Sequence, residues 1–151
     1  MQLHKLISTW LGIGYIGKGA GTVAAIVTCA AWYFAWAGGF PPLYISLAIT
    51  LAITFVGVWS SGVVSKVWGK DPSKVVVDEA AGMCISLLFL PVNWKYVIAA
   101  LILFRFFDIA KPLFIRKVEK LPGGWGIMFD DVLAGIYANV LLQIALAFKL
   151  F

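Results

Sequence analysis

Five apolar stretches, separated by short segments with glycine, proline or charge, dominate the pattern of residues along the chain. They cover residues 20–37, 43–65, 75–92, 96–109 and 127–148. The first two contain no charged residue, and each of the other three carries its charges toward one end. A helix needs about 20 apolar residues to cross a bilayer, because lipid cannot satisfy backbone polar groups. The second and fifth stretches meet that length, the first and third are marginal, and the fourth is short enough to need shielding by its neighbours.

Glycine and proline mark the boundaries between these stretches. The breaks fall at 38–42, 69–72, 91–93 and 121–124, with Pro112 closing the fourth stretch. The N-terminal residues show no signal-peptide cleavage pattern and are expected to remain as a short interfacial helix rich in Trp and Tyr. The pattern therefore predicts an all-α fold: a polytopic membrane bundle of about five apolar helices plus a short N-terminal interfacial helix. Whether the first stretch spans or lies in the interface stays open.

Composition strengthens the membrane interpretation. Of the 151 residues, 62% are hydrophobic and 13% are charged, whereas soluble domains carry about 25% charged residues. The net charge of +5 does not by itself indicate a nucleic-acid partner, because basic residues in membrane proteins mark cytoplasmic loops. The two cysteines, Cys29 and Cys84, lie in apolar runs without a CxxC pattern, so we expect buried thiols rather than a zinc site or a disulfide.

The distribution of charge predicts an orientation. If five helices alternate across the membrane, ten of the twelve basic residues fall on one side, and only Lys95 and Lys149 fall on the other. The positive-inside rule then puts the N-terminus in the cytoplasm. All seven acidic residues fall on the same cytoplasmic side.

Five carboxylates sit at the predicted cytoplasmic ends of three different helices. They are Asp78, Glu79, Asp108, Asp130 and Asp131. Charges at the edge of an apolar layer are costly unless they are paired or bound to a cation, and Mg²⁺ prefers oxygen ligands. The alternative is that acidic residues merely suit helix N-termini, but this fails for Asp108, which lies at a predicted C-terminal end.

Small and polar residues recur every four positions on the same helices. The stripes are Asp78, Gly82 and Ser86 on the third helix, and Asp131, Gly135, Asn139 and Gln143 on the fifth. Such stripes favour close helix packing in membranes and would turn the two aspartates inward together. A similar stripe on the second helix, Thr50, Thr54, Gly57, Ser61 and Ser65, is interpreted as packing alone.

Candidate phosphate-binding groups lie beside these carboxylates. Arg105 and Lys111 flank Asp108 at a spacing of three, which suits either phosphate binding or a structural ion pair. The glycine-rich segment 17–22 precedes the first helix and offers Lys18 and Thr22 at a possible anion site, although it is no Walker loop. The only histidine, His4, lies near the N-terminus, which leaves an activated water or a carboxylate as the nucleophile.

Four segments resemble the phosphatidylglycerophosphatase A family. They are FRFFDIAKP (104–112), GGWGIMFDDVLAGIYAN (123–139), DPSKVVVDEAAG (71–82) and, more loosely, GKGAGT (17–22). The chain departs from the family pattern at Ala20-Gly21 and Leu113-Phe114, where family members often carry proline. These departures affect loop shape and leave the carboxylates unchanged.

The resemblance implies a single phosphatidylglycerophosphatase A-like membrane domain over residues 1–151. It implies a Mg²⁺-dependent, multi-pass lipid phosphatase of the bacterial inner membrane that hydrolyses phosphatidylglycerophosphate to phosphatidylglycerol, with its active site facing the cytoplasm. By matching motif, the five carboxylates would be metal ligands or general base. Arg105 and Lys111 would neutralise the phosphate, with Lys18 and Thr22 as helpers.

The leading alternative is a small ion-coupled transporter, which would also turn carboxylates inward. Transport sites are expected near the bilayer midplane, whereas these carboxylates cluster at one interface. An alcohol phosphotransferase is disfavoured because its DGxxAR-type signature is absent, and a non-catalytic membrane subunit is the third alternative.

Overall fold

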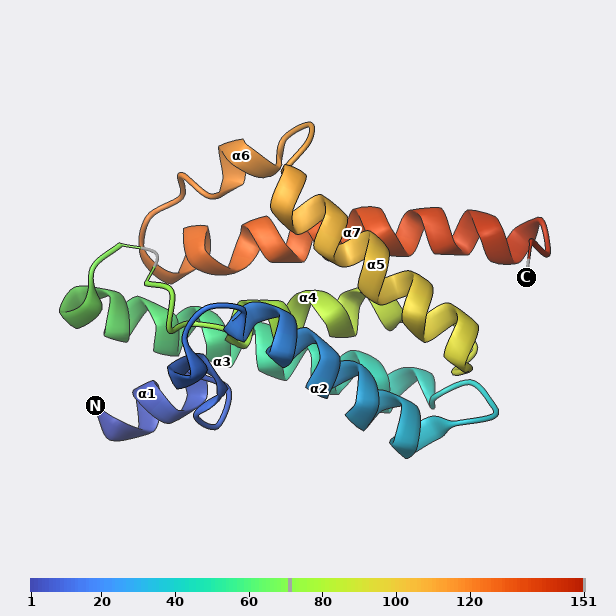
Figure 1. The fold of residues 1–151 in the computed structure, drawn as a ribbon, viewed down its shortest axis with the longest axis horizontal. Helices are drawn as coiled ribbons and strands as arrows, with labels where there is room; N and C mark the ends of the chain where they lie inside the picture. Colours follow the sequence, from blue (N-terminus) through green and yellow to red (C-terminus); the bar gives the residue numbers. More distant parts are fainter. Residues whose placement is uncertain (71, 151) are drawn as a thin grey trace.

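The computed structural model describes residues 1–70 and 72–150, and within them the chain is helical and contains no strand (Figure 1). The all-α prediction is confirmed. The elements are α1 (Gln2–Ser8), the 3₁₀ helix η1 (Ile13–Ile16), α2 (Ala20–Trp36), α3 (Leu43–Trp68), α4 (Val77–Leu87), α5 (Trp94–Ala110), α6 (Ile115–Val118) and α7 (Gly123–Ala147). Asp71, the first residue of one family-like motif, lies outside the described residues.

Two helices, α3 and α7, are long and apolar enough to cross a membrane. They have 26 and 25 residues, whereas α2 and α5 have 17 each and α4 has 11. At a rise of 1.5 Å per residue, α4 is only about 16 Å long, roughly half the hydrocarbon thickness. Five membrane-length helices are therefore not confirmed, and the third predicted stretch contains a short helix followed by a turn.

Helix α4 lies at the centre of the bundle. It packs on α2, α3, α5 and α7. Figure 1 shows α4 between α2 and α3 below it and α5 and α7 above it. Most of its residues are buried, and Met83, Cys84 and Leu87 belong to the main hydrophobic cluster. Burial of this helix within protein explains how an element too short to span can lie among apolar helices.

Two glycines bring α4 and α7 into close contact. A Cβ added to Gly82 would lie 2.8 Å from the backbone oxygen of Asp131, and one added to Gly135 would lie 2.5 Å from the backbone oxygen of Gly82. The stripes of small residues therefore act as packing surfaces, as the sequence predicts. This contact holds the first turn of α4 beside the carboxylates of α7.

The C-terminal end of α4 is capped by side chains from α7. The amide nitrogen of Asn139 donates to the carbonyl oxygens of Ser86, at 3.1 Å, and Leu88, at 2.7 Å. Gln143 donates to the carbonyl oxygens of Leu88 and Phe89, both at 3.2 Å. Carbonyls that α4 leaves unpaired where it ends are thus satisfied inside the protein.

Helix α7 begins earlier than expected, because the segment Gly123-Gly124-Trp125-Gly126 is helical rather than a turn. A Cβ on Gly124 would lie 1.9 Å from the carbonyl oxygen of Val58, so this glycine lets α7 approach the backbone of α3 closely. The Ser and Thr stripe of α3 is largely buried, and Gly57 accommodates Met128 of α7. Its predicted role in packing agrees with these contacts.

The expected short N-terminal helix is present as α1, which packs along α3. His4 lies 3.2 Å from Ser60 through Nδ1 and Oγ, and its ring contacts that of Trp59 edge to face. The histidine is therefore held against α3, away from the five predicted carboxylates.

Candidate active site

A cavity of about 440 Å³ lies where α2 and α4 begin, α5 ends and the third turn of α7 passes. All five predicted carboxylates line it, together with Arg105 and Lys111. Asp78 and Glu79 come from the first turn of α4, Asp108 from the last turn of α5, and Asp130 and Asp131 from α7. The structure thus brings together seven of the nine predicted site residues.

The position of the α7 carboxylates changes how they are explained. Because α7 begins at Gly123, Asp130 and Asp131 lie two turns inside the helix rather than at its N-terminus. A favourable interaction with the helix dipole falls off within the first turn. Capping therefore does not explain these two residues, although it still suits Asp78 and Glu79.

The carboxylates form two overlapping groups. Asp78, Asp130 and Asp131 form one, and Glu79, Asp108 and Asp131 form the other. Within each group, one carboxylate oxygen per residue lies within 4.8 Å of the others. Asp131 belongs to both groups and is only 1% exposed. Oxygens gathered at this spacing are a ligand set suited to a hard divalent cation.

Three of these carboxylates carry a buried oxygen without a hydrogen-bond partner among the described residues. The atoms are Oδ1 of Asp78, Oε2 of Glu79 and Oδ2 of Asp131. Buried polar atoms are nearly always hydrogen-bonded, and an unpaired buried carboxylate oxygen is particularly costly. The residues present therefore fit a bound cation, which would give these oxygens a partner.

Electrostatics within the cavity favour the uptake of positive charge. Burial, followed by repulsion from Glu79, raises the pKa of Asp78 well above its usual range. Asp78 lies on α4, which is too short to span a membrane. A cation beside this carboxylate would oppose both effects by favouring the ionised form.

Lys111 connects several of the carboxylates. Its Nζ lies 2.8 Å from Asp130, 3.5 Å from Glu119 and 3.8 Å from Asp108. Burial lowers the pKa of Lys111, but the hydrogen bond to Asp130 and the surrounding negative charges outweigh this effect and raise the pKa above its usual range. Lys111 therefore stays positively charged at any physiological pH.

Arg105 provides the second positive charge. It makes an ion pair with Asp108 through a short hydrogen bond and lies 3.8 Å from Glu79. Its Nε is buried and has no partner among the described residues. The predicted structural ion pair is therefore present, and the Nε–H of Arg105 remains able to donate a hydrogen bond to an anion.

The glycine-rich segment contributes backbone rather than side chains. Gly19 and Gly21 line the cavity, whereas Lys18 and Thr22 are exposed and lie outside its lining. A Cβ on Gly21 would lie 2.5 Å from Oε1 of Glu79, so a side chain there would crowd the site. The roles suggested for Lys18 and Thr22 stay predictions that this arrangement does not support.

Sequence reasoning missed other residues at the cavity. Pro72 and Ser73 line it, and Glu119 approaches Lys111 from the segment that follows α6. Ser73 and Glu119 lie outside the helices, and no helical spacing in the sequence connects either of them with Asp108 or Asp130.

Comparisons with known proteins agree with this site. The family model described as "Phosphatidylglycerophosphatase A" matches residues 6–146. A phosphatidylglycerophosphatase A of Escherichia coli is 35% identical over 150 residues, covering 91% of this chain and 84% of its own length. One from Haemophilus influenzae is 50% identical over 74 residues, or 48% of this chain and 45% of its own.

A protein of Bacteroides thetaiotaomicron is 44% identical over 149 residues, covering 95% of this chain and 93% of its own length. Its name provisionally assigns it as a phosphatidylinositol-3-phosphatase. No solved structure matches the chain. The family match extends over nearly the whole sequence and includes every residue that lines the carboxylate cavity. The chain belongs to the phosphatidylglycerophosphatase A family and, as that membership indicates, is a phosphatase.

Proposed function

We propose that this protein is a Mg²⁺-dependent phosphatase that hydrolyses phosphatidylglycerophosphate to phosphatidylglycerol and inorganic phosphate at the cytoplasmic face of the inner membrane. The observation that carries this proposal is the convergence of five carboxylates from three helices on one cavity. Three of the carboxylates have an unpaired buried oxygen, and the cationic side chains of Arg105 and Lys111 lie beside them. A phosphatase site needs both cation ligands and anion-binding groups, and this cavity offers both.

Asp131 is the first candidate for a metal ligand, because it is common to both carboxylate groups. Asp78 and Glu79 follow, because each has an unpaired buried oxygen. A divalent cation held there would supply Lewis-acid charge that neutralises the phosphate and favours ionisation of water near neutral pH. Without that charge, the five carboxylates would outnumber the two cationic side chains, and the cavity would repel a phosphate monoester.

The remaining roles fall to the protein's own groups. Lys111 and Arg105 are placed to hold phosphate oxygens and to neutralise charge that develops in the transition state. A carboxylate that is not bound to the cation would accept a proton from the attacking water. Asp108 and Asp130 are candidates for this base, and each already contacts a cationic side chain.

The membrane placement rests on the apolar surface and the charge pattern. Large apolar side chains are exposed along α3, α5 and α7, including Phe55 on α3, Ile102 on α5 and Val140 on α7. Contiguous exposed apolar surface marks contact with lipid or a partner. We propose that residues 1–151 form a single multi-pass domain with a cytoplasmic N-terminus, which places the cavity where a lipid headgroup would meet it.

The Bacteroides relative raises a second candidate substrate. Phosphatidylinositol 3-phosphate, which its name implies, shares a phosphomonoester on a phosphatidyl headgroup with phosphatidylglycerophosphate. Both lipids would present the same group to the carboxylate cavity. The two substrates are therefore compared in one experiment.

The test is phosphate release by purified protein in detergent, with each lipid, in the presence of Mg²⁺ or of EDTA. We expect Mg²⁺-dependent release that favours phosphatidylglycerophosphate and is lost in Asp131→Asn. Glu119→Gln is a matched control, because Glu119 contacts Lys111 but does not line the cavity. Absence of release from correctly folded wild-type protein would overturn the proposal, and ion uptake into proteoliposomes would then test the transporter alternative.

A further inference from the structure

A second, apolar cavity runs between α2 and α5. Its volume is about 280 Å³. It is called here the α2–α5 groove, and its lining comprises Ile26, Cys29, Ala30, Tyr33 and Phe34 from α2, with Trp94, Val97, Ile98 and Leu101 from α5. None of these lining residues is charged, in contrast to the carboxylate cavity.

We propose that the α2–α5 groove holds one acyl chain of the phosphatidyl substrate while its phosphomonoester occupies the carboxylate cavity. This inference rests on the proposed function, since the groove would bind the apolar part of the lipid whose phosphate occupies the carboxylate cavity. An apolar groove binds a hydrocarbon chain because the surfaces of the groove and of the chain are both buried on contact.

The register of α5 connects the groove with the carboxylate cavity. Trp94, Ile98 and Leu101 line the groove, and Arg105 lines the carboxylate cavity. Successive members of this set are four, three and four residues apart, so all of them lie on one face of the helix. Arg105 is thus one turn beyond the end of the groove.

The register of α2 makes the same connection. Gly21 lines the carboxylate cavity and Cys29 lines the groove, with Ala25 halfway between them. Residues four apart form continuous rows on a helix surface. Ala25 and Cys29 are buried in the main hydrophobic cluster, so this row of α2 faces into the bundle. Both helices therefore lead from the phosphate-binding groups to the apolar groove.

The dimensions of the groove suit a lipid in one leaflet. From Leu101 to Trp94 the helix rises roughly 10 Å, about a third of the hydrocarbon thickness. The groove extends from Leu101, which lies one turn before Arg105, to Trp94 at the start of α5. A lipid whose headgroup reached the carboxylates would direct its chains the same way.

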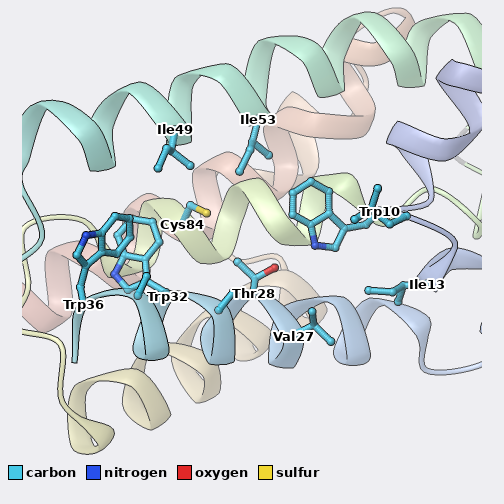
Figure 2. Close-up of a pocket in the computed structure, with 12 residues that line it drawn as sticks. Trp10, Ile13, Val27, Thr28, Trp32, Trp36, Ile49, Ile53 and Cys84 are labelled. Atoms are coloured by element: carbon cyan, nitrogen blue, oxygen red, sulfur yellow. The ribbon is translucent and has the colours of Figure 1, made fainter.

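A larger apolar cavity of about 420 Å³ lies on the other side of α2, facing α3 (Figure 2). Figure 2 shows Trp10 toward one end, Trp32 and Trp36 toward the other, and Cys84 of α4 between α2 and α3. Volume alone would favour this cavity for lipid.

This larger cavity is separated from the carboxylates. Ala20, Ala24 and Val76 form a buried cluster, and Trp10 and Ile13 pack against it. Val76 also lines the carboxylate cavity, so the cluster stands between the two spaces. The cavity facing α3 therefore serves as an internal control for the acyl-chain proposal.

Adjacent alanines on α2 give matched variants. Ala30 lines the α2–α5 groove and Ala31 lines the cavity facing α3, and both are exposed. Ala30→Trp would fill the first space and Ala31→Trp the second, with the same added volume. Because both alanines are exposed, neither substitution has to displace packed protein.

The experiment uses phosphatidylglycerophosphate with a photoreactive diazirine midway along one acyl chain, at a low mole fraction in phosphatidylcholine nanodiscs. After irradiation, the labelled residues of wild type, Ala30→Trp and Ala31→Trp are mapped by mass spectrometry. We expect label on α2 and α5 residues of the groove, reduced about tenfold in Ala30→Trp, because a bulky side chain fills a small apolar site. Ala31→Trp should retain the wild-type pattern.

Three outcomes would overturn the acyl-chain proposal. The first is label concentrated in the cavity facing α3 and lost in Ala31→Trp. The second is label spread evenly over the apolar surface, and the third is label in the groove that Ala30→Trp leaves unchanged. Phosphate release on the same samples separates this result from the proposed function: labelling of the groove without any release would refute the phosphatase proposal alone.

Discussion

Asp131→Asn is expected to stabilise the metal-free protein while abolishing phosphate release. Asp131 is 1% exposed, belongs to both carboxylate groups and has one oxygen without a partner among the described residues. Asparagine has nearly the same shape, so the substitution removes a charge without leaving a cavity. Residues that serve function at a cost in stability are common at active sites.

The size of the effect follows from the spacing of the carboxylates. Two unit charges at 4.8 Å, the upper limit of the oxygen spacing within each group, repel by about 3.5 kcal/mol at an effective dielectric constant of about 20. Asp131 has four such neighbours, so full ionisation would cost about as much as a domain's whole stability, which is roughly 5–15 kcal/mol. Bound protons and the two nearby cations must therefore offset most of the repulsion. We expect a net gain of about 1–3 kcal/mol from the substitution.

The assay is thermal unfolding in detergent, in EDTA and in saturating Mg²⁺. For a chain of this length, a gain of 1–3 kcal/mol corresponds to a rise of about 2–12 °C in the midpoint. Wild-type protein should gain about 2.7 kcal/mol from Mg²⁺ at a hundredfold excess over the dissociation constant, and the variant should lose most of that gain. A destabilised variant in EDTA, or one that Mg²⁺ stabilises as much as wild type, would refute the reasoning.

Three further substitutions test the packing and charge of the site. Gly135→Ala should destabilise the protein by about 1–3 kcal/mol, because the new Cβ would meet the backbone oxygen of Gly82. Gly62→Ala should not lower the unfolding midpoint, because the nearest atom to its new Cβ, the backbone nitrogen of Gly124, is 3.4 Å away. Asn139→Leu should cost about 1–3 kcal/mol by leaving α4 carbonyls unpaired, and thermal unfolding would show no loss if water replaced the amide. Lys111→Met should lower the midpoint equally at about pH 6 and about pH 9. The folded protein raises the pKa of Lys111, so its contribution to stability is complete below the unfolded-state pKa of 10.5 and is lost only as the pH rises through the pKa of the folded state. A loss that already shrinks by pH 9 would contradict that assignment.

The all-α class and the gathering of carboxylates could be predicted because both depend on local periodicity. Apolar runs, helix-breaking residues and four-residue spacing determine which side chains share a face, and the structure places Asp78 and Asp131 on facing helices accordingly. The same reasoning brought Lys111 near Asp108, since both lie at one helix end.

Features that depend on contacts between distant segments could not be predicted. The short length of α4 depends on carbonyl caps from Asn139 and Gln143, more than 50 residues away. Helix α7 begins at Gly123 because Gly124 packs against α3, although a run of glycines favours a turn locally. On α2, one residue of helical rotation decides that Gly21 faces Glu79 while Thr22 is exposed.

The capping of α4 by α7 has a consequence for how the protein is made. A ribosome completes α4 well before it reaches Asn139 and Gln143, so the carbonyls at the end of α4 lack these partners during synthesis. The same delay applies to Asp130 and Asp131, which come from the same late segment. Assembly of the site is therefore a late event in biogenesis, and a truncated chain lacking α7 would have neither a finished central helix nor a complete set of carboxylates.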